Sequence, residues 1–143
     1  MKMPAAETYD DEMLFMPWGR MLDAIAVYLA KALPDGASVV DLMCGTGYLL
    51  RQLAALRPDL DLIAVDLNTD YLGLGCSLEE GNSIIWEVED ARSYRWDADC
   101  VICTGGIHHL KPEEQGTFVW HLAELTRPDG LCVIAEPCIA PYK

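Results

Sequence analysis

The stretch Val39-Val40-Asp41-Leu42-Met43-Cys44-Gly45-Thr46-Gly47-Tyr48-Leu49-Leu50 has the pattern of a buried strand, a glycine turn and the start of a helix. Apolar β-branched residues lead in, and leucines then recur at helical spacing as far as Leu56. Gly45 and Gly47 give the turn backbone freedom and leave room for a ligand to lie against it. In an open α/β sheet, the turn after the first strand is where ligands bind, facing the unpaired amides of the helix.

The rest of the chain alternates helices with strands. The expected strands are 38–42, 61–66, 83–88, 98–103 and 131–135, and the expected helices cover 17–33, 48–56, a short irregular stretch around 71–74, and a segment that begins at 111–114. Gly73 and Gly75 weaken the third helix, for which Asn68 or Thr69 is a plausible cap. Alternation of this kind predicts a doubly wound, mostly parallel α/β sheet.

The last helix and strand carry clear local signals. Pro112 stands in the first turn, followed by acidic residues that suit the positive end of a helix. Its expected buried face is made of Phe118, Val119, Leu122 and Leu125. Residues 127–130, Arg-Pro-Asp-Gly, are expected to form a turn before the final strand.

Length and charge limit the possible classes of function. The 143 residues suffice for one domain, expected at 17–143 after a flexible arm at 1–16. A net charge of −13 with ten scattered basic residues argues against nucleic acid or an anionic membrane as the main partner. The polar, acidic start has no apolar core of a targeting signal, so a cytoplasmic location is expected.

Six cysteines are present, and no metal site is expected from them. Cys100 and Cys103 have the spacing of a metal or redox pair, but they lie on an apolar strand, where residues three apart face opposite sides. The other cysteines also stand in apolar surroundings, which predicts reduced, buried thiols.

The glycine turn does not fit the common nucleotide-binding patterns. A dinucleotide fingerprint needs glycine where this chain has Leu50, and the Gly-Lys-Ser/Thr of a P-loop is absent. What is left, an acidic strand end and a Cys-Gly-Thr-Gly turn, resembles motif I of the class I S-adenosylmethionine (SAM)-dependent methyltransferases. Asp41, Gly45 and Gly47 match that motif, whereas Met43 stands where its first glycine is usual.

The resemblance implies SAM as the cofactor and assigns residues to its parts. The methionine portion would be held by Asp41, Met43, Cys44, Gly45, Thr46 and Gly47, and approached by Thr104 and Gly105. Asp66, at the end of the second strand, would accept hydrogen bonds from the ribose hydroxyls, as acidic residues there also do in NAD-binding folds; the alternative is an N-cap for the next helix. Leu67, Asp90 and Ala91 would contact the adenine.

The acceptor is expected to enter above the fourth strand. The sequence Gly106-Ile-His-His-Leu is similar to the corresponding segment of small-molecule methyltransferases, so His108 or His109 is a candidate general base. The alternative is that one histidine packs under the sheet and the other caps the helix. Tyr9 of the arm could close over the donor, and Glu136 ends strand five near the acceptor side without an assigned role.

The family sheet has seven strands and ends in an antiparallel β-hairpin, whereas five strands are visible here before Lys143. We therefore expect a core without that hairpin, and either missing sequence, a homodimer or a partner chain along strand five. The predicted function is in-line transfer of the SAM methyl group to a small-molecule acceptor. The alternatives are a SAM-binding subunit that is inactive without a partner and, less favoured by the turn, an NAD-dependent dehydrogenase.

Overall fold

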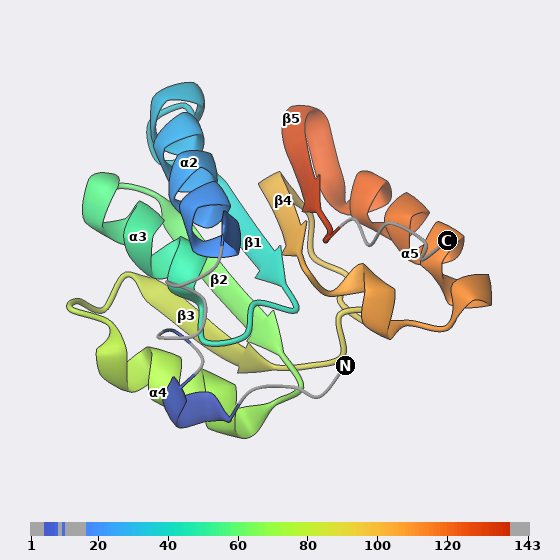
Figure 1. The fold of residues 1–143 in the computed structure, drawn as a ribbon. Helices are drawn as coiled ribbons and strands as arrows, with labels where there is room; N and C mark the ends of the chain where they lie inside the picture. Colours follow the sequence, from blue (N-terminus) through green and yellow to red (C-terminus); the bar gives the residue numbers. More distant parts are fainter. Residues whose placement is uncertain (1–4, 9, 11–16, 138–143) are drawn as a thin grey trace.

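A computed structural model describes residues 5–8, 10 and 17–137, and Figure 1 shows their arrangement. The sheet has the order β3-β2-β1-β4-β5, and all four pairs of neighbouring strands are parallel. The strands are β1 (Ser38–Leu42), β2 (Asp61–Asp66), β3 (Ile84–Val88), β4 (Ala98–Thr104) and β5 (Thr126–Ala135). The predicted parallel sheet is confirmed.

Helices cover both faces of the sheet (Figure 1). They are η1 (Ala6–Thr8), α2 (Pro17–Ala32), α3 (Tyr48–Leu56), α4 (Thr69–Leu78), η2 (Ile107–His109) and α5 (Pro112–Leu125). Leucines of α2, α3 and α4 form one buried cluster with Val39, whereas α5 packs with Tyr94 in a second cluster around Val40. Because successive residues of a strand face opposite sides, the two clusters mark the two covered faces of a doubly wound fold.

Strand β1 lies at the point where the direction of winding reverses. The chain proceeds from β1 through β2 to β3 on one side, then returns to place β4 on the other side of β1. Asp41 is therefore paired with Ala64 of β2 and with Ile102 of β4. Ligands of open α/β sheets bind at such a switch point, outside the carboxyl ends of the strands.

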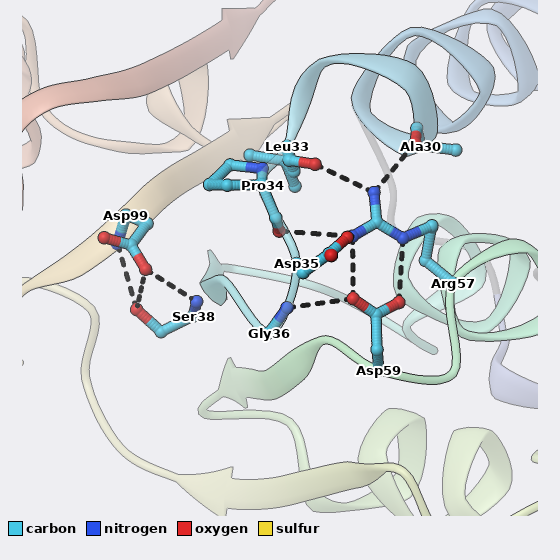
Figure 2. Close-up of polar contacts among 9 residues, drawn as sticks. All are labelled: Ala30, Leu33, Pro34, Asp35, Gly36, Ser38, Arg57, Asp59 and Asp99. Atoms are coloured by element: carbon cyan, nitrogen blue, oxygen red, sulfur yellow. Dashed lines mark hydrogen bonds and ion pairs between the residues drawn. The ribbon is translucent and has the colours of Figure 1, made fainter.

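At the opposite, amino ends of the strands, ion pairs and hydrogen bonds to the backbone hold the elements together (Figure 2). Arg57 pairs with Asp59 and also donates to carbonyl oxygens at the end of α2, those of Ala30, Leu33 and Pro34. The guanidinium, helped by the N–H of Gly36, holds the pKa of Asp59 well below its usual range. Nearby, Asp99 of β4 accepts from both the backbone N–H and the hydroxyl of Ser38. The polar contacts at this edge thus join α2, α3, β1 and β4.

Strand β5 contains the segment that was expected to be a turn. Thr126 pairs with Ala98 and Leu131 with Cys100, so residues 127–130 bulge out of the ladder, with Asp129 at φ 65°. The segment is therefore a bulge within β5, which is an outer strand of the described sheet. A partner along β5 stays a prediction.

Three further sequence-based expectations are wrong. Val119 is 39% exposed, while Phe118, Leu122 and Leu125 are buried as expected. Cys76 and Cys132 are exposed thiols, whereas Cys44, Cys100 and Cys103 are buried and free. Cys100 and Cys103 do belong to opposite faces, as predicted, because each joins a different core cluster.

The third correction concerns α4, which is a regular helix of 10 residues capped by the Asn68 side chain. Gly75 is present for packing: a Cβ there would lie 2.1 Å from the carbonyl oxygen of Thr46 and 2.7 Å from the Trp86 ring. The helix can approach the glycine turn this closely only because position 75 has no side chain. Gly73 differs, because a Cβ at that position would meet nothing within 4 Å.

The two glycines of α4 should respond to alanine in opposite directions. Gly75→Ala forces Thr46 or Trp86 to move and should lower the free energy of unfolding by about 1–3 kcal/mol. Gly73→Ala, the matched control, should raise it by about 1 kcal/mol through helix propensity alone. Urea denaturation of both variants measures this difference, and equal effects would contradict the packing role of Gly75.

In the described part of the chain, no helix is both long and apolar enough to span a membrane.

Candidate functional site

The glycine turn is fixed by the carboxylate of Asp66, which ends β2. Its Oδ2 accepts from the N–H of Gly45 at 2.8 Å, and its Oδ1 accepts from the N–H of Asn68 at 2.8 Å. Asp66 therefore joins the turn after β1 to the start of α4 and does not itself cap α4, a role that Asn68 fills. Each oxygen keeps a second lone pair for a ligand.

Asp41 is the most unusual group at this edge. Its carboxylate is 1% exposed, and within the described residues its Oδ1 has no hydrogen-bond partner. Burial and then the nearby Asp66 raise the pKa of Asp41 well above its ordinary value. A buried carboxylate without a partner destabilises the fold, so its place below the turn indicates a polar or cationic ligand that completes it.

Helix α3 begins at the turn with its first amides uncapped by any side chain. Gly47 precedes it at φ 72°, and a Cβ there would lie 2.5 Å from the Trp86 ring. These amides point positive partial charge beyond the carboxyl ends of the strands and suit a carboxylate or phosphate. Beside them, burial raises the pKa of Cys44, as do Asp41 and Asp66, so this turn cysteine is a thiol.

Met43 adopts the backbone conformation of the glycine that it replaces. Its φ is 61°, in the left-handed region, which costs a residue with a side chain about 1–2 kcal/mol. Its side chain packs against Gly106 in the loop after β4, where a Cβ would lie 2.4 Å from the Met43 sulfur. Met43 and Gly106 therefore share one space between the turn after β1 and the loop after β4.

A contact that the sequence did not reveal joins the N-terminal segment to the turn. The buried Thr46 hydroxyl donates to Asp10, which also forms an ion pair with Arg51 of α3. Arg51 in turn donates to the carbonyl oxygen of Thr46. No local pattern pairs residues so far apart in the chain. Tyr9, the expected donor-covering residue, lies outside the described residues.

The residues expected around an adenine follow β2 and β3. Leu67 is 61% exposed, as suits an apolar side chain that a ligand would cover, and Ala91 is buried. Asp90 forms a bidentate pair with Arg92, whose hydrogen bonds lower the pKa of Asp90. The Asp90 carboxylate is therefore already engaged, and a ligand there must share it with Arg92.

The loop after β4 is attached to β5. The N–H of Gly105 donates to the carbonyl oxygen of Ala135 at 2.7 Å, and Trp18 of α2 packs against Gly105. Thr104, the last residue of β4, is partly buried beside it. Glu136 follows β5 and contacts both His108 and the start of η2. The structure therefore brings Glu136 to the predicted acceptor side, where the sequence assigned it no role.

The carboxyl edge of the sheet is mainly acidic. Asp41, Asp66 and Glu136 lie at the ends of three strands there, and Asp10 reaches it from the N-terminal segment. Among the described residues, no group of three His, Cys, Asp or Glu side chains is placed to hold a metal ion.

Comparison with known proteins identifies the family. The family described as "Methyltransferase domain" matches residues 39–130, from β1 to the bulge of β5. The chain belongs to the methyltransferase-domain family. The matched region contains the glycine turn, Asp66, Asp90 and the loop after β4.

Two curated relatives align with most of this methyltransferase domain. A carboxy-S-adenosyl-L-methionine synthase of Campylobacter hominis is 28% identical over 78% of the chain. A tRNA (carboxymethyluridine(34)-5-O)-methyltransferase, ALKBH8, of Mus musculus is 27% identical over 82% of the chain. The chain spans 49% of the length of the first and 16% of the second.

Solved structures support the same assignment. The magnesium protoporphyrin IX methyltransferase of Synechocystis PCC 6803, solved with bound SAM, has a TM-score of 0.67 at 26% identity, covering 75% of this chain and 53% of that one. An O-methyltransferase family protein of Burkholderia thailandensis has a TM-score of 0.73 at 25% identity, and the match covers 90% of this chain and 40% of that one. The methyltransferase domain therefore has the fold that the sequence predicted.

The buried Asp41 should make the ligand-free methyltransferase domain less stable as the pH rises. Its native pKa lies above the ordinary 3.8, so the native state binds the proton more tightly and the free energy of unfolding falls through that window. Asparagine does not titrate, so the Asp41→Asn variant lacks this pH dependence. Within the window, its free energy of unfolding should rise relative to that of the wild type by up to about 1.4 kcal/mol per pH unit.

Urea denaturation of both proteins between about pH 4 and pH 8 measures the difference. Asp97→Asn, at an exposed carboxylate on the opposite edge, is the control and should follow the wild type. Parallel curves for Asp41→Asn and the wild type would show that Asp41 carries no buried charge penalty.

Proposed function

We propose that this chain binds SAM at the glycine turn and catalyses transfer of its methyl group to a small-molecule acceptor. The observation that carries the proposal is Asp41, a buried carboxylate with an unpartnered oxygen below the turn. SAM supplies a sulfonium-activated methyl group together with an ammonium, a carboxylate, a ribose and an adenine. The domain offers a complementary group for each of these parts.

The methionine end of SAM fits the turn by charge. Asp41 offers a buried carboxyl group whose ionised form the ammonium of SAM would stabilise, and the uncapped amides of α3 suit the carboxylate. The sulfonium is also better placed at an acidic edge than a phosphate would be. The remaining turn residues, Met43 to Gly47, give the backbone surface against which this end lies.

The nucleoside end fits the next two strand ends. Asp66 keeps lone pairs for two ribose hydroxyls while it holds Gly45 and Asn68. Leu67 supplies an exposed apolar surface for the adenine, and the buried Ala91 is the second apolar residue assigned to it. Asp90 accepts from the adenine amino group while it remains paired with Arg92.

A small molecule is the proposed acceptor because of the charge of the chain. A net charge of −13 disfavours a polyanion, although the mouse relative is by its name a tRNA methyltransferase. The loop from Thr104 to His109 would meet the acceptor, and Asp10 of the N-terminal segment contacts Thr46 of the glycine turn. In-line attack there needs positioning of the acceptor and exclusion of water.

The alternatives differ in ligand or in turnover. NAD carries a negative diphosphate, which the carboxylate of Asp66 beside the turn would repel. A SAM-binding subunit without its own activity would use the same site but would methylate an acceptor only with a partner protein.

Calorimetric titration with SAM, S-adenosylhomocysteine and NAD tests the proposal. The two adenosyl ligands should bind and NAD should not. Binding of NAD alone, or of none of the three by a folded sample, would contradict it. If SAM binds and no acceptor is methylated until another protein is added, the subunit alternative holds.

Asp66→Ala should weaken SAM binding about 100-fold, because charge-assisted hydrogen bonds to the ribose are lost. Asp66→Asn, which keeps an acceptor oxygen, should lose less. The matched control is Asp97→Asn, with unchanged affinity. Unchanged affinity in Asp66→Ala would exclude the ribose role.

A further inference from the structure

Glu136 holds two groups of the loop after β4 with one carboxylate. Its Oε1 accepts from the backbone N–H of Ile107 at 2.7 Å, and its Oε2 lies 2.7 Å from Nδ1 of His108. Both side chains are partly buried, at 32% exposure for His108 and 25% for Glu136. This contact joins the end of β5 to the first turn after β4 and fixes the orientation of the imidazole.

The pairing also selects one form of the ring. A carboxylate accepts and cannot donate, so Nδ1 of His108 carries the proton in this contact. In the neutral ring, Nε2 is then an unprotonated acceptor. Nε2 is then the ring atom that can accept a proton from an acceptor hydroxyl. His108 is therefore arranged to accept a proton at a defined atom.

The position of the pair connects it to the donor side. Gly106, next to Ile107, contacts the Met43 side chain at the glycine turn. The N–H of Gly105 donates a hydrogen bond to the carbonyl oxygen of Ala135, which directly precedes Glu136. The pair thus stands at the carboxyl ends of β4 and β5, beside the turn that the proposed function assigns to the methionine end of SAM.

The neighbouring histidine lacks these properties. The His109 ring lies 4.0 Å from that of His108, centroid to centroid, and among the described residues no carboxylate contact fixes its tautomer. Burial lowers the pKa of His109 and His108 lowers it further, while the charge of Glu136 offsets only part of this shift. The sequence left the two histidines equivalent, and the structure distinguishes them by their contact with Glu136.

We infer that His108 is the general base for a protic hydroxyl acceptor and that Glu136 is its positioning residue. This inference rests on the proposed function and names its substrate class. The hydroxyl proton passes to Nε2 of His108 while the acceptor oxygen forms the new O–CH₃ bond. The S–CH₃ bond breaks, its electron pair stays on sulfur, and the proton then leaves His108 to solvent.

A phenolic hydroxyl is the acceptor for which such a base matters most. Phenols titrate near pH 10, so at neutral pH the oxygen is a weak nucleophile until its proton is removed. An acceptor that is already ionised does not need His108. The pair therefore predicts a difference between two phenols that are alike in shape and unlike in acidity.

Nitrogen NMR of the histidine rings tests the geometry without any acceptor. In the wild type, His108 should show a protonated Nδ1 and an unprotonated Nε2 at slightly alkaline pH. Glu136→Ala should release the ring to the other tautomer, and Glu136→Gln, whose amide oxygen still accepts, should largely retain it. A wild-type ring with its proton on Nε2 overturns the inference.

Methyl transfer from SAM tests the chemistry, measured with phenol and with 4-nitrophenol at slightly alkaline pH. There 4-nitrophenol is largely ionised and phenol is not. His108→Asn should lower kcat for phenol by about 10²–10⁴-fold and for the nitrophenolate less than tenfold. Glu136→Ala should lower kcat for phenol about 10–100-fold, as loss of an orienting carboxylate does. His121→Asn, a histidine on α5 paired with Arg95, is the matched control.

The outcomes separate this inference from the proposed function. Calorimetry should show the same SAM affinity in the wild type and in His108→Asn. Equal losses for both phenols, no loss for phenol, or a wild type that binds SAM and methylates neither phenol would each overturn the role of His108. Absence of SAM binding in the wild type would instead refute the proposed function.

Discussion

The carboxylate of Asp66 is the contact on which the carboxyl edge of this domain depends. It receives one N–H from the glycine turn after β1 and one from the start of α4. Two connections that belong to different strands are thereby held at a fixed separation. Helix α4 can then pack its Gly75 directly against the carbonyl oxygen of Thr46. A substitution at Asp66 therefore affects a ligand contact and the shape of the crevice together.

Satisfied and unsatisfied polar groups lie at opposite ends of the strands. At the amino edge, Arg57 and Asp99 satisfy carbonyl and amide groups that would otherwise be unpaired. At the carboxyl edge, Asp41 is buried and, among the described residues, its Oδ1 has no partner. The first set of contacts provides a rigid frame, whereas the second leaves a buried carboxyl oxygen without a partner. Such separation is common where strained or unsatisfied groups serve a site.

Local sequence patterns predicted most of the fold because each pattern reflects one local cause. Alternating strands and helices gave the parallel sheet, and Pro112 and Asn68 marked helix starts correctly. The error at α4 arose because glycine lowers helix propensity, while its packing advantage at Gly75 depends on Thr46, which is distant in the chain. Val119 was misplaced because α5 buries a narrower stripe than its apolar residues suggest.

The position of the candidate site residues at strand ends was predictable for the same reason, because the carboxyl ends of parallel strands meet. Their partners were not. Asp10 binds Thr46 across 36 positions, and Glu136 selects His108 over His109 through a contact between the end of β5 and η2. Periodicity carries no information about such pairs, because they depend on how the finished elements face one another.

The shared space of Met43 and Gly106 restricts the order in which this site can change. A side chain added at position 106 meets the Met43 sulfur, so that substitution has no room while methionine is present. If position 43 first becomes glycine, the left-handed turn is relieved and space opens beside the loop. The two positions are therefore sterically coupled, and a side chain at position 106 requires a smaller residue at position 43.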